Sequence, residues 1–140
     1  MEKRFLTGFG AFDTKIKTAE QYKTIELKDV ARLCRNPRTE EKQNAQWAIF
    51  STYVEHDARS HDRQREDGHF VALAGDIDTG NKTMVEVVNA IKEICGSVHF
   101  LVYSTSGATQ ENKKWRFLVP VRHNLPGYRY SEIQRAFFDC

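Results

Sequence analysis

Cysteine and proline are scarce in this chain, and it has no long apolar run. Its 140 residues include three cysteines and three prolines. The cysteines are odd in number, widely spaced and without a Cys-x-x-Cys pair, so neither a disulfide framework nor a zinc knuckle is supported. No apolar run approaches the roughly 18 residues that span a bilayer, and no signal-like stretch follows the amino end. The sequence therefore predicts a cytoplasmic protein that has no membrane partner.

Charge of one sign is not in excess either. Lys+Arg 21 against Asp+Glu 19 gives a formal net charge of +2. This balance is too even for the whole molecule to be drawn to nucleic acid, so only a local basic patch could do so. With 40% hydrophobic residues, no internal repeat and no low-complexity tract, the chain is predicted to be a single domain over residues 1–140.

The first half of the chain predicts four separate segments. Residues 4–9 could form a short strand, and residues 27–34 have helical apolar spacing. Residues 47–54 are rich in aromatic and β-branched side chains, which is typical of a buried strand. Residues 55–68 are almost wholly polar, which indicates a loop or a solvated helix. The segments that carry motifs come after these four.

An apolar run that ends in two acids lies at residues 70–78 and predicts a central strand buried on both faces. Thr83 and Glu86 form a capping box for the next helix, which Gly96 closes. Residues 98–103 predict another strand. This strand–helix–strand order is typical of a right-handed βαβ unit that places the two strands parallel in one sheet.

The last third predicts a strand and a helix. Residues 114–121 alternate loosely, and the loop before them should turn this strand antiparallel to its neighbour. Pro120 indicates a sheet edge or a strand end, and His99 is interpreted as a core histidine. Ser131 and Gln134 form a second capping box for a final helix. The order of elements predicts an α/β (α+β) fold.

Asp76 and Asp78 are the candidates for a metal site. Because side chains alternate along a strand, both carboxylates are expected on one face with Ile77 on the other. Two carboxylates can share a hard cation such as Mg²⁺, whose other positions are filled by water and substrate phosphate. Such pairs are also common at turns, and the alternative is that Asp78 caps Gly80 or Asn81 while Asp76 is solvated.

Two further segments could bind phosphate or nucleic acid. The polar loop after residue 103 offers hydroxyl and backbone N–H groups to phosphate oxygens, although ordinary loops contain the same residue types. Its candidates are Ser104, Thr105 and Ser106. The next segment is a basic strip around Trp115, which could bind phosphate bidentately or could protect an edge strand from aggregation. The strip consists of Lys113, Lys114, Arg116, Arg122 and His123.

Taken in order, these motifs resemble one family. The chain carries, one after another, the segments Asp76-Ile77-Asp78, Ser104-Thr105-Ser106 and Lys114-Trp115-Arg116-Phe117-Leu118-Val119-Pro120. This order resembles the archaeo-eukaryotic primase superfamily, in particular its phage and plasmid primase-polymerase members. The resemblance covers roughly residues 46 to 123.

The resemblance implies an RRM-like mixed sheet with helices, the catalytic core of archaeo-eukaryotic primases. It implies nucleotidyl transfer in DNA replication, with Mg²⁺ or Mn²⁺, nucleoside triphosphates and a DNA or RNA template. Asp76 and Asp78 would then be the catalytic metal ligands. The nucleotide and its phosphates would be bound by Ser104, Thr105, Ser106, Lys114 and Arg116. Further partners would be the helicase or origin-binding domains of a longer replication protein.

The chain departs from the family's pattern at two points. Ser106 stands where family members carry a histidine, and after Arg116 only Glu132 and Asp139 could supply a third carboxylate. The chain is therefore a piece of a longer protein, or its site is incomplete.

Two alternative functions are kept beside nucleotidyl transfer. One is a catalytically degenerate primase-fold module that binds DNA at a replication origin or single strands. Its nucleic-acid-binding candidates are Arg59, Arg63, Lys113, Lys114, Arg116 and Trp115. The other alternative is a metal-dependent nuclease that uses the same Asp pair.

Overall fold

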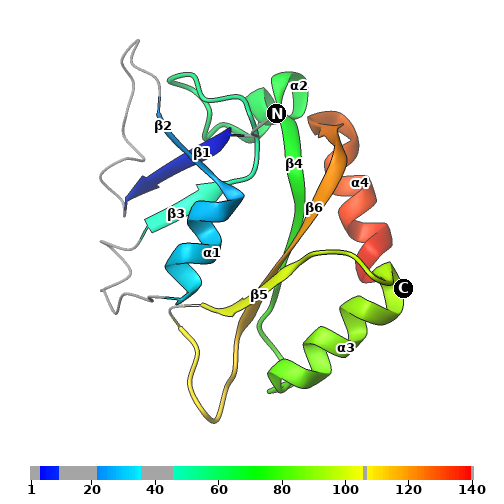
Figure 1. The fold of residues 1–140 in the computed structure, drawn as a ribbon. Coiled ribbons are helices and arrows are strands. Elements are labelled where there is room, and N and C mark those ends of the chain that lie inside the picture. Colours follow the sequence, from blue (N-terminus) through cyan, green and yellow to red (C-terminus); the bar gives the residue numbers. More distant parts are fainter. Residues whose placement is uncertain (1–3, 10–21, 36–45, 106, 140) are drawn as a thin grey trace.

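The computed structural model describes residues 4–9, 22–35, 46–105 and 107–139. Within these residues the fold is mixed α+β, with two antiparallel three-stranded sheets and four helices (Figure 1). The elements in chain order are β1 (Arg4–Phe9), β2 (Lys23–Glu26), α1 (Leu27–Arg35), β3 (Gln46–Ile49), α2 (His61–Asp67), β4 (His69–Ile77), α3 (Met84–Cys95), β5 (Leu101–Ser104), β6 (Trp115–Pro126) and α4 (Gly127–Phe138).

The strand order is β2-β1-β3 in the first sheet and β4-β6-β5 in the second. Every neighbouring pair is antiparallel. β4 and β5 therefore run parallel to each other, as the sequence predicts, but they are separated by β6. The prediction that residues 70–78 form the central strand is wrong, because the 12-residue β6 returns along β4 and takes the central place.

The beginning of β4 is joined to the segment that follows β3. The Val71 N–H donates to the Phe50 carbonyl at 2.8 Å, and the Thr52 N–H donates to the His69 carbonyl at 3.0 Å. The predicted strand at residues 47–54 is therefore only partly correct. β3 ends early, and the residues after it pair with β4 instead of extending the first sheet.

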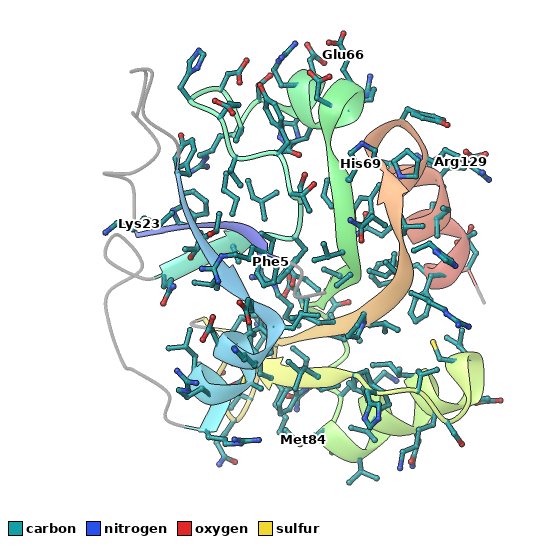
Figure 2. The ribbon with its side chains drawn as sticks, turned by 45° about the horizontal axis from the view of Figure 1, so that its top comes forward. Phe5, Lys23, Glu66, His69, Met84 and Arg129 are labelled. Carbon is teal, nitrogen blue, oxygen red and sulfur yellow. The ribbon has the colours of Figure 1, made fainter. Side chains whose placement is uncertain are left out.

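The second sheet is covered on both faces. On one face, α3 and α4 enclose a core formed by Leu73, Val87, Ile91, Phe117 and Val119. On the other face, the first sheet and α1 enclose a core formed by Phe5, Val30, Phe50, Val71, Ala72 and Leu118. Figure 2 shows Phe5 in the middle of the molecule, between the first sheet and β4. Its side chain is fully buried, which stabilises the fold by about 1.5–3 kcal/mol relative to an exposed ring.

The helix α3 begins and ends as predicted. The Thr83 hydroxyl accepts a hydrogen bond from the Glu86 N–H at 3.2 Å, and the Glu86 carboxylate accepts one from the Thr83 N–H at 3.4 Å. Gly96 ends the helix with φ +73°, in the left-handed region that favours glycine. The next strand begins only at Leu101, because the chain first turns back toward the sheet. His99 is exposed in this connection, so its prediction as a core histidine is wrong.

The prediction for the last helix is wrong about its start. α4 begins at Gly127 directly after Pro126, and Ser131 and Gln134 lie inside it. Proline ends β6 because it fixes φ and has no N–H to donate. Gly127 allows α4 to approach α2 closely, since a methyl group on it would lie 1.8 Å from the carbonyl oxygen of Gln64.

Pro120 lies within β6, opposite Ala72 and beside a shift in the register of β4. β5 pairs with β6 only over Trp115–Leu118. Pro120 is therefore at a locally open edge, although β6 is the central strand of its sheet. This arrangement removes the conflict between a proline and a central strand, because no β5 residue needs its missing N–H.

The polar segment at residues 55–68 contains the short helix α2. Ser60 caps it by accepting a hydrogen bond from the Arg63 N–H at 3.3 Å. Among the helices of the residues described, none combines the length and the apolar character needed to cross a membrane.

Candidate functional site

Asp76, Arg116 and Tyr103 form one row across the second sheet. Asp76 of β4 pairs in register with Arg116 of β6, and Arg116 pairs on its other side with Tyr103 of β5. Side chains that are opposite one another in a sheet lie on the same face. The Tyr103 ring packs against the core between this sheet and the first one, so the row lies on that face of the second sheet.

Asp76 and Arg116 are directly joined by a two-pronged ion pair. The Arg116 Nε lies 2.6 Å from Asp76 Oδ1, and Arg116 Nη2 lies 3.1 Å from Oδ2. The Asp76 side chain is 42% exposed, and that of Arg116 is 34% exposed. The hydrogen bond to Asp76 raises the pKa of Arg116, although partial burial acts in the opposite direction. The guanidinium therefore stays charged and uses both oxygens of the carboxylate.

Tyr103 lies on the other side of the guanidinium. Burial raises the pKa of its phenol, while the charge of Arg116 and a hydrogen bond with it act to lower this pKa. The raised pKa keeps the phenol protonated at neutral pH. A neutral hydroxyl is thus available to orient the Arg116 head group.

Asp78 lies outside the strand. β4 ends at Ile77, and Asp78 is an exposed residue that opens a turn in which Gly80 and Asn81 both have positive φ, +84° and +46°. The predicted strand alternation therefore applies to Asp76 but stops one residue before Asp78. The two carboxylates are still neighbours in the chain at the same end of β4.

The turn after β4 is fastened to the loop between β5 and β6. Asn81 Oδ1 accepts a hydrogen bond from the Lys113 backbone N–H at 2.9 Å and one from the Lys113 Nζ at 3.4 Å. The Trp115 indole N–H donates to the Lys82 carbonyl at 2.8 Å. Two segments that are about 30 residues apart in the chain thus form one end of the sheet, at the bottom of Figure 1.

The predicted phosphate loop lies at this same end. Ser104 is the exposed last residue of β5, and the Thr105 N–H donates to the Lys114 carbonyl at 3.1 Å. The ammonium group of Lys114 is near Gly107, because a methyl on that glycine would lie 3.6 Å from its Nζ. Ser106 lies outside the described residues. The structure therefore brings Ser104, Thr105 and Lys114 to the end of the sheet where Asp78 and Lys113 lie.

Trp115 lies on the opposite face from Arg116, as expected for consecutive residues of a strand. It is half-buried and packs against the core under α3 and α4, opposite Ile77 in register. The structure thus gives Trp115 a packing role and a hydrogen bond to the turn. Its predicted role in stacking on nucleic acid stays a prediction.

Arg59 and Arg63 are not brought to this site. They belong to the α2 region at the start of β4, and Asp76 lies roughly 20–25 Å further along that strand (Figure 1). The guanidinium of Arg59 lies 4.7 Å from the centre of the Trp47 ring. Arg63 is bound by the side chains of Tyr53, Asp57, Glu66 and Asp67. The acidic partners of Arg63 offset its charge, which does not favour its predicted contact with nucleic acid.

The donor chemistry of the two aspartates fits a hard divalent cation. Mg²⁺ takes one or two carboxylates and completes its shell with water and phosphate oxygens. Among the described residues, no group of three or more His, Cys, Asp or Glu side chains could hold a metal ion. Glu132 lies in α4 and Asp139 caps its carboxyl end, and α4 covers the opposite face of the sheet, so neither supplies a third carboxylate at Asp76.

Sequence reasoning missed three residues of this site: Tyr103, Asn81 and Lys82. Tyr103 is next to Arg116 only because β5 pairs with β6 in one particular register, which no local pattern reveals. Asn81 carried a usable signal, because Gly-Asn is a turn sequence and asparagine tolerates the left-handed region better than most residues. The contact that Lys82 makes through its backbone carbonyl has no signature in the sequence.

Comparisons with known proteins assign no family to the chain. No protein-family model, no curated protein and no solved structure matches it. What the fold itself defines is a mixed α+β protein with two antiparallel sheets.

Proposed function

We propose that this chain is a primase-polymerase-like domain that catalyses nucleotidyl transfer in DNA replication. The observation that carries the proposal is the pairing of Asp76 with Arg116. These residues come from two motifs 40 positions apart, and the sheet brings them into direct contact. The polar loop that follows β5 lies at the same end of the sheet. The second sheet, in which β4 and β5 are parallel and flank β6, further supports the RRM-like core of this class.

The site residues then have distinct roles. Asp76 and Asp78 would hold Mg²⁺ or Mn²⁺, because carboxylate oxygens suit both ions. Lys114 and Arg116 would bind the triphosphate, Arg116 through the planar fork that matches phosphate oxygens. Ser104 and Thr105 would supply hydroxyl and N–H donors in the loop. When bound, the divalent cation supplies activation of the attacking hydroxyl and stabilisation of the pyrophosphate leaving group.

Calorimetric titration of dATP with MnCl₂ tests this proposal. The wild-type chain should bind the nucleotide in a Mn²⁺-dependent way, and the Asp76→Ala, Asp78→Ala double variant should not. Glu93→Ala on the exposed side of α3 is a control, because it removes an acidic charge outside the site, one against the two of the double variant. Equal binding by the wild type and the double variant would contradict the proposal.

Binding of a nucleic-acid template without turnover is a second candidate function. It is favoured by the cations at this end of the sheet, Lys82, Lys113, Lys114 and Arg116, and by the full use of Asp76 in an ion pair. This function predicts salt-dependent binding of single-stranded DNA that weakens in the Lys113→Ala, Lys114→Ala variant. A labelled primer on a template, with dNTPs and Mn²⁺, separates the candidates: extension indicates a polymerase, shortening a nuclease, and an unchanged length a binding module.

A further inference from the structure

Both oxygens of the Asp76 carboxylate are engaged by Arg116. The two contacts are 2.6 Å and 3.1 Å long and are held by the register of β4 and β6. The guanidinium keeps its charge at any ordinary pH, so the pair is not opened by deprotonation of Arg116, and a competing ligand for either residue can open it. Both side chains are partly exposed, which leaves the pair accessible to such partners.

A divalent cation at Asp76 competes directly with Arg116. It requires an oxygen that already accepts a hydrogen bond, and it is repelled by the guanidinium that donates this bond. A phosphate group competes from the other side, because the same N–H fork that binds a carboxylate also binds phosphate. Each ligand bound alone therefore leaves one of the two residues without its partner. Both ligands bound together satisfy both residues.

We propose that Asp76 and Arg116 form an exchange latch that couples binding of the divalent cation to binding of the triphosphate. The latch rests on the proposed function, since it regulates the same site. Arg116 leaves Asp76 for a phosphate when the cation takes the carboxylate. Either ligand alone binds weakly to the latched site, and each strengthens the binding of the other by the same factor.

The surroundings of Arg116 favour this exchange. Tyr103 flanks the guanidinium on the side away from Asp76 and stays protonated, so it can keep a hydrogen bond to Arg116 in either position. Lys114 precedes Arg116 by two residues and lies beside the loop that would bind the phosphates. A triphosphate bound there would therefore lie near the side chains of both Lys114 and Arg116.

Binding of Mn²⁺ alone, measured from the electron paramagnetic resonance signal of the free ion, tests the latch. Without nucleotide, Arg116→Gln should bind Mn²⁺ at least about fivefold more tightly than the wild type, because Asp76 is released. Arg116→Lys keeps the charge but cannot form the two-pronged pair, so it should show part of this gain. A gain in Arg116→Gln with none in Arg116→Lys overturns the latch, because simple charge repulsion then explains the result.

Adding dATP completes the test. The nucleotide should strengthen Mn²⁺ binding more in the wild type than in Arg116→Gln, since only the wild type has a latch to open. If Mn²⁺–dATP binding depends on Asp78 but Arg116→Gln gains no affinity for Mn²⁺, the latch is wrong and the proposed function stands. If neither the wild type nor any variant binds Mn²⁺ with dATP present, both the proposed function and the latch are wrong. Circular dichroism checks that each variant is folded. If Arg116→Gln does not fold, the Mn²⁺ affinity of Arg116→Lys is compared with that of the wild type instead.

Discussion

The Gln134 side-chain amide of α4 donates a hydrogen bond to the backbone carbonyl of Ala74 in β4. One helical turn earlier, the Tyr130 hydroxyl accepts a hydrogen bond from the Ala74 N–H at 3.1 Å. β4 is an edge strand of its sheet, and both backbone groups of Ala74 face outward from it, where they need partners other than β6. The last helix thus protects this edge with side chains.

Removing either contact should destabilise the fold. We expect Gln134→Ala to lower the free energy of unfolding by about 1–2 kcal/mol, and Tyr130→Phe by about 1 kcal/mol, because each leaves a partly buried backbone group unsatisfied. The phenylalanine keeps the ring that stacks on Phe70 at 3.9 Å, so the second variant isolates the hydroxyl. Urea denaturation measures both values. Tyr128→Phe is a control, since Tyr128 is an exposed residue of the same helix. A loss in Tyr128→Phe equal to that in Tyr130→Phe would contradict this assignment.

The side-chain network of Tyr53, Asp57 and Arg63 next to α2 should make the free energy of unfolding depend on pH in the acidic range. Tyr53 Oη donates a hydrogen bond of 2.5 Å to Asp57 Oδ1, and this bond, with the charge of Arg63, lowers the pKa of Asp57. A lowered pKa in the folded state means that the contribution of Asp57 is present above its unfolded pKa. It is lost as the pH falls through the folded value.

Tyr53→Phe tests this network. The variant removes the donor but keeps the ring over which Arg63 lies, so the pKa of Asp57 should rise toward its ordinary value. NMR titration of the Asp57 side-chain carboxyl measures the change, and Tyr128→Phe provides the control, since Tyr128 is an exposed tyrosine of α4. An Asp57 pKa that does not move in Tyr53→Phe would show that another group lowers it.

Asn81 should hold the loop between β5 and β6 in place. Its side chain accepts the Lys113 backbone N–H at 2.9 Å. Replacing it with glycine keeps the positive φ of +46° easy to adopt and removes only the acceptor. We expect the Lys113 amide to exchange its hydrogen roughly fivefold faster in Asn81→Gly, which corresponds to the loss of a hydrogen bond of about 1 kcal/mol. Asn81→Asp keeps the acceptor and should retain the protection. Equal exchange rates in the wild type and Asn81→Gly would remove Asn81 from this role.

The sequence predicts those elements whose signals are local. The strand at Arg4–Phe9, the helix near Leu27 and the capping box at Thr83 all follow from side chains close together in the chain, and the structure confirms them. The start of α4 was mistaken because Ser131 and Gln134 match a capping box by type. Gln134 instead serves Ala74, which lies 60 residues earlier. Packing between distant segments decided that position.

The site could be predicted only in part for the same reason. The spacing of Asp76 and Asp78 indicated a pair of carboxylates, and the loose alternation of residues 114–121 indicated that Arg116 lies in a strand. No local pattern reveals that β6 enters between β4 and β5, and this order is what places Arg116 against Asp76 and beside Tyr103. Strand order is set by contacts between segments far apart in the chain, which local patterns do not contain.

The close approach of α4 to α2 should make Gly127 intolerant of a side chain. A methyl group there would lie 1.8 Å from the Gln64 carbonyl oxygen and 2.9 Å from that of Arg65, and both are backbone atoms that cannot rotate away. The Gly127 N–H also donates to the Gly68 carbonyl at 2.8 Å, so moving α4 aside would break this bond. We expect Gly127→Ala to lower the free energy of unfolding by about 1–3 kcal/mol, as overpacked sites do.

Gly107→Ala is the matched control, because a methyl at Gly107 meets only the Lys114 side chain at an ordinary 3.6 Å. Urea denaturation of the two variants measures the difference. A large loss in Gly127→Ala with little change in Gly107→Ala would show that the contact of α2 with α4 fixes the last helix against the edge of β4. Similar stabilities of the two variants would mean that α4 can shift without cost, so that its apolar packing and the hydrogen bonds that Tyr130 and Gln134 form with Ala74, rather than the contact with α2, fix its place.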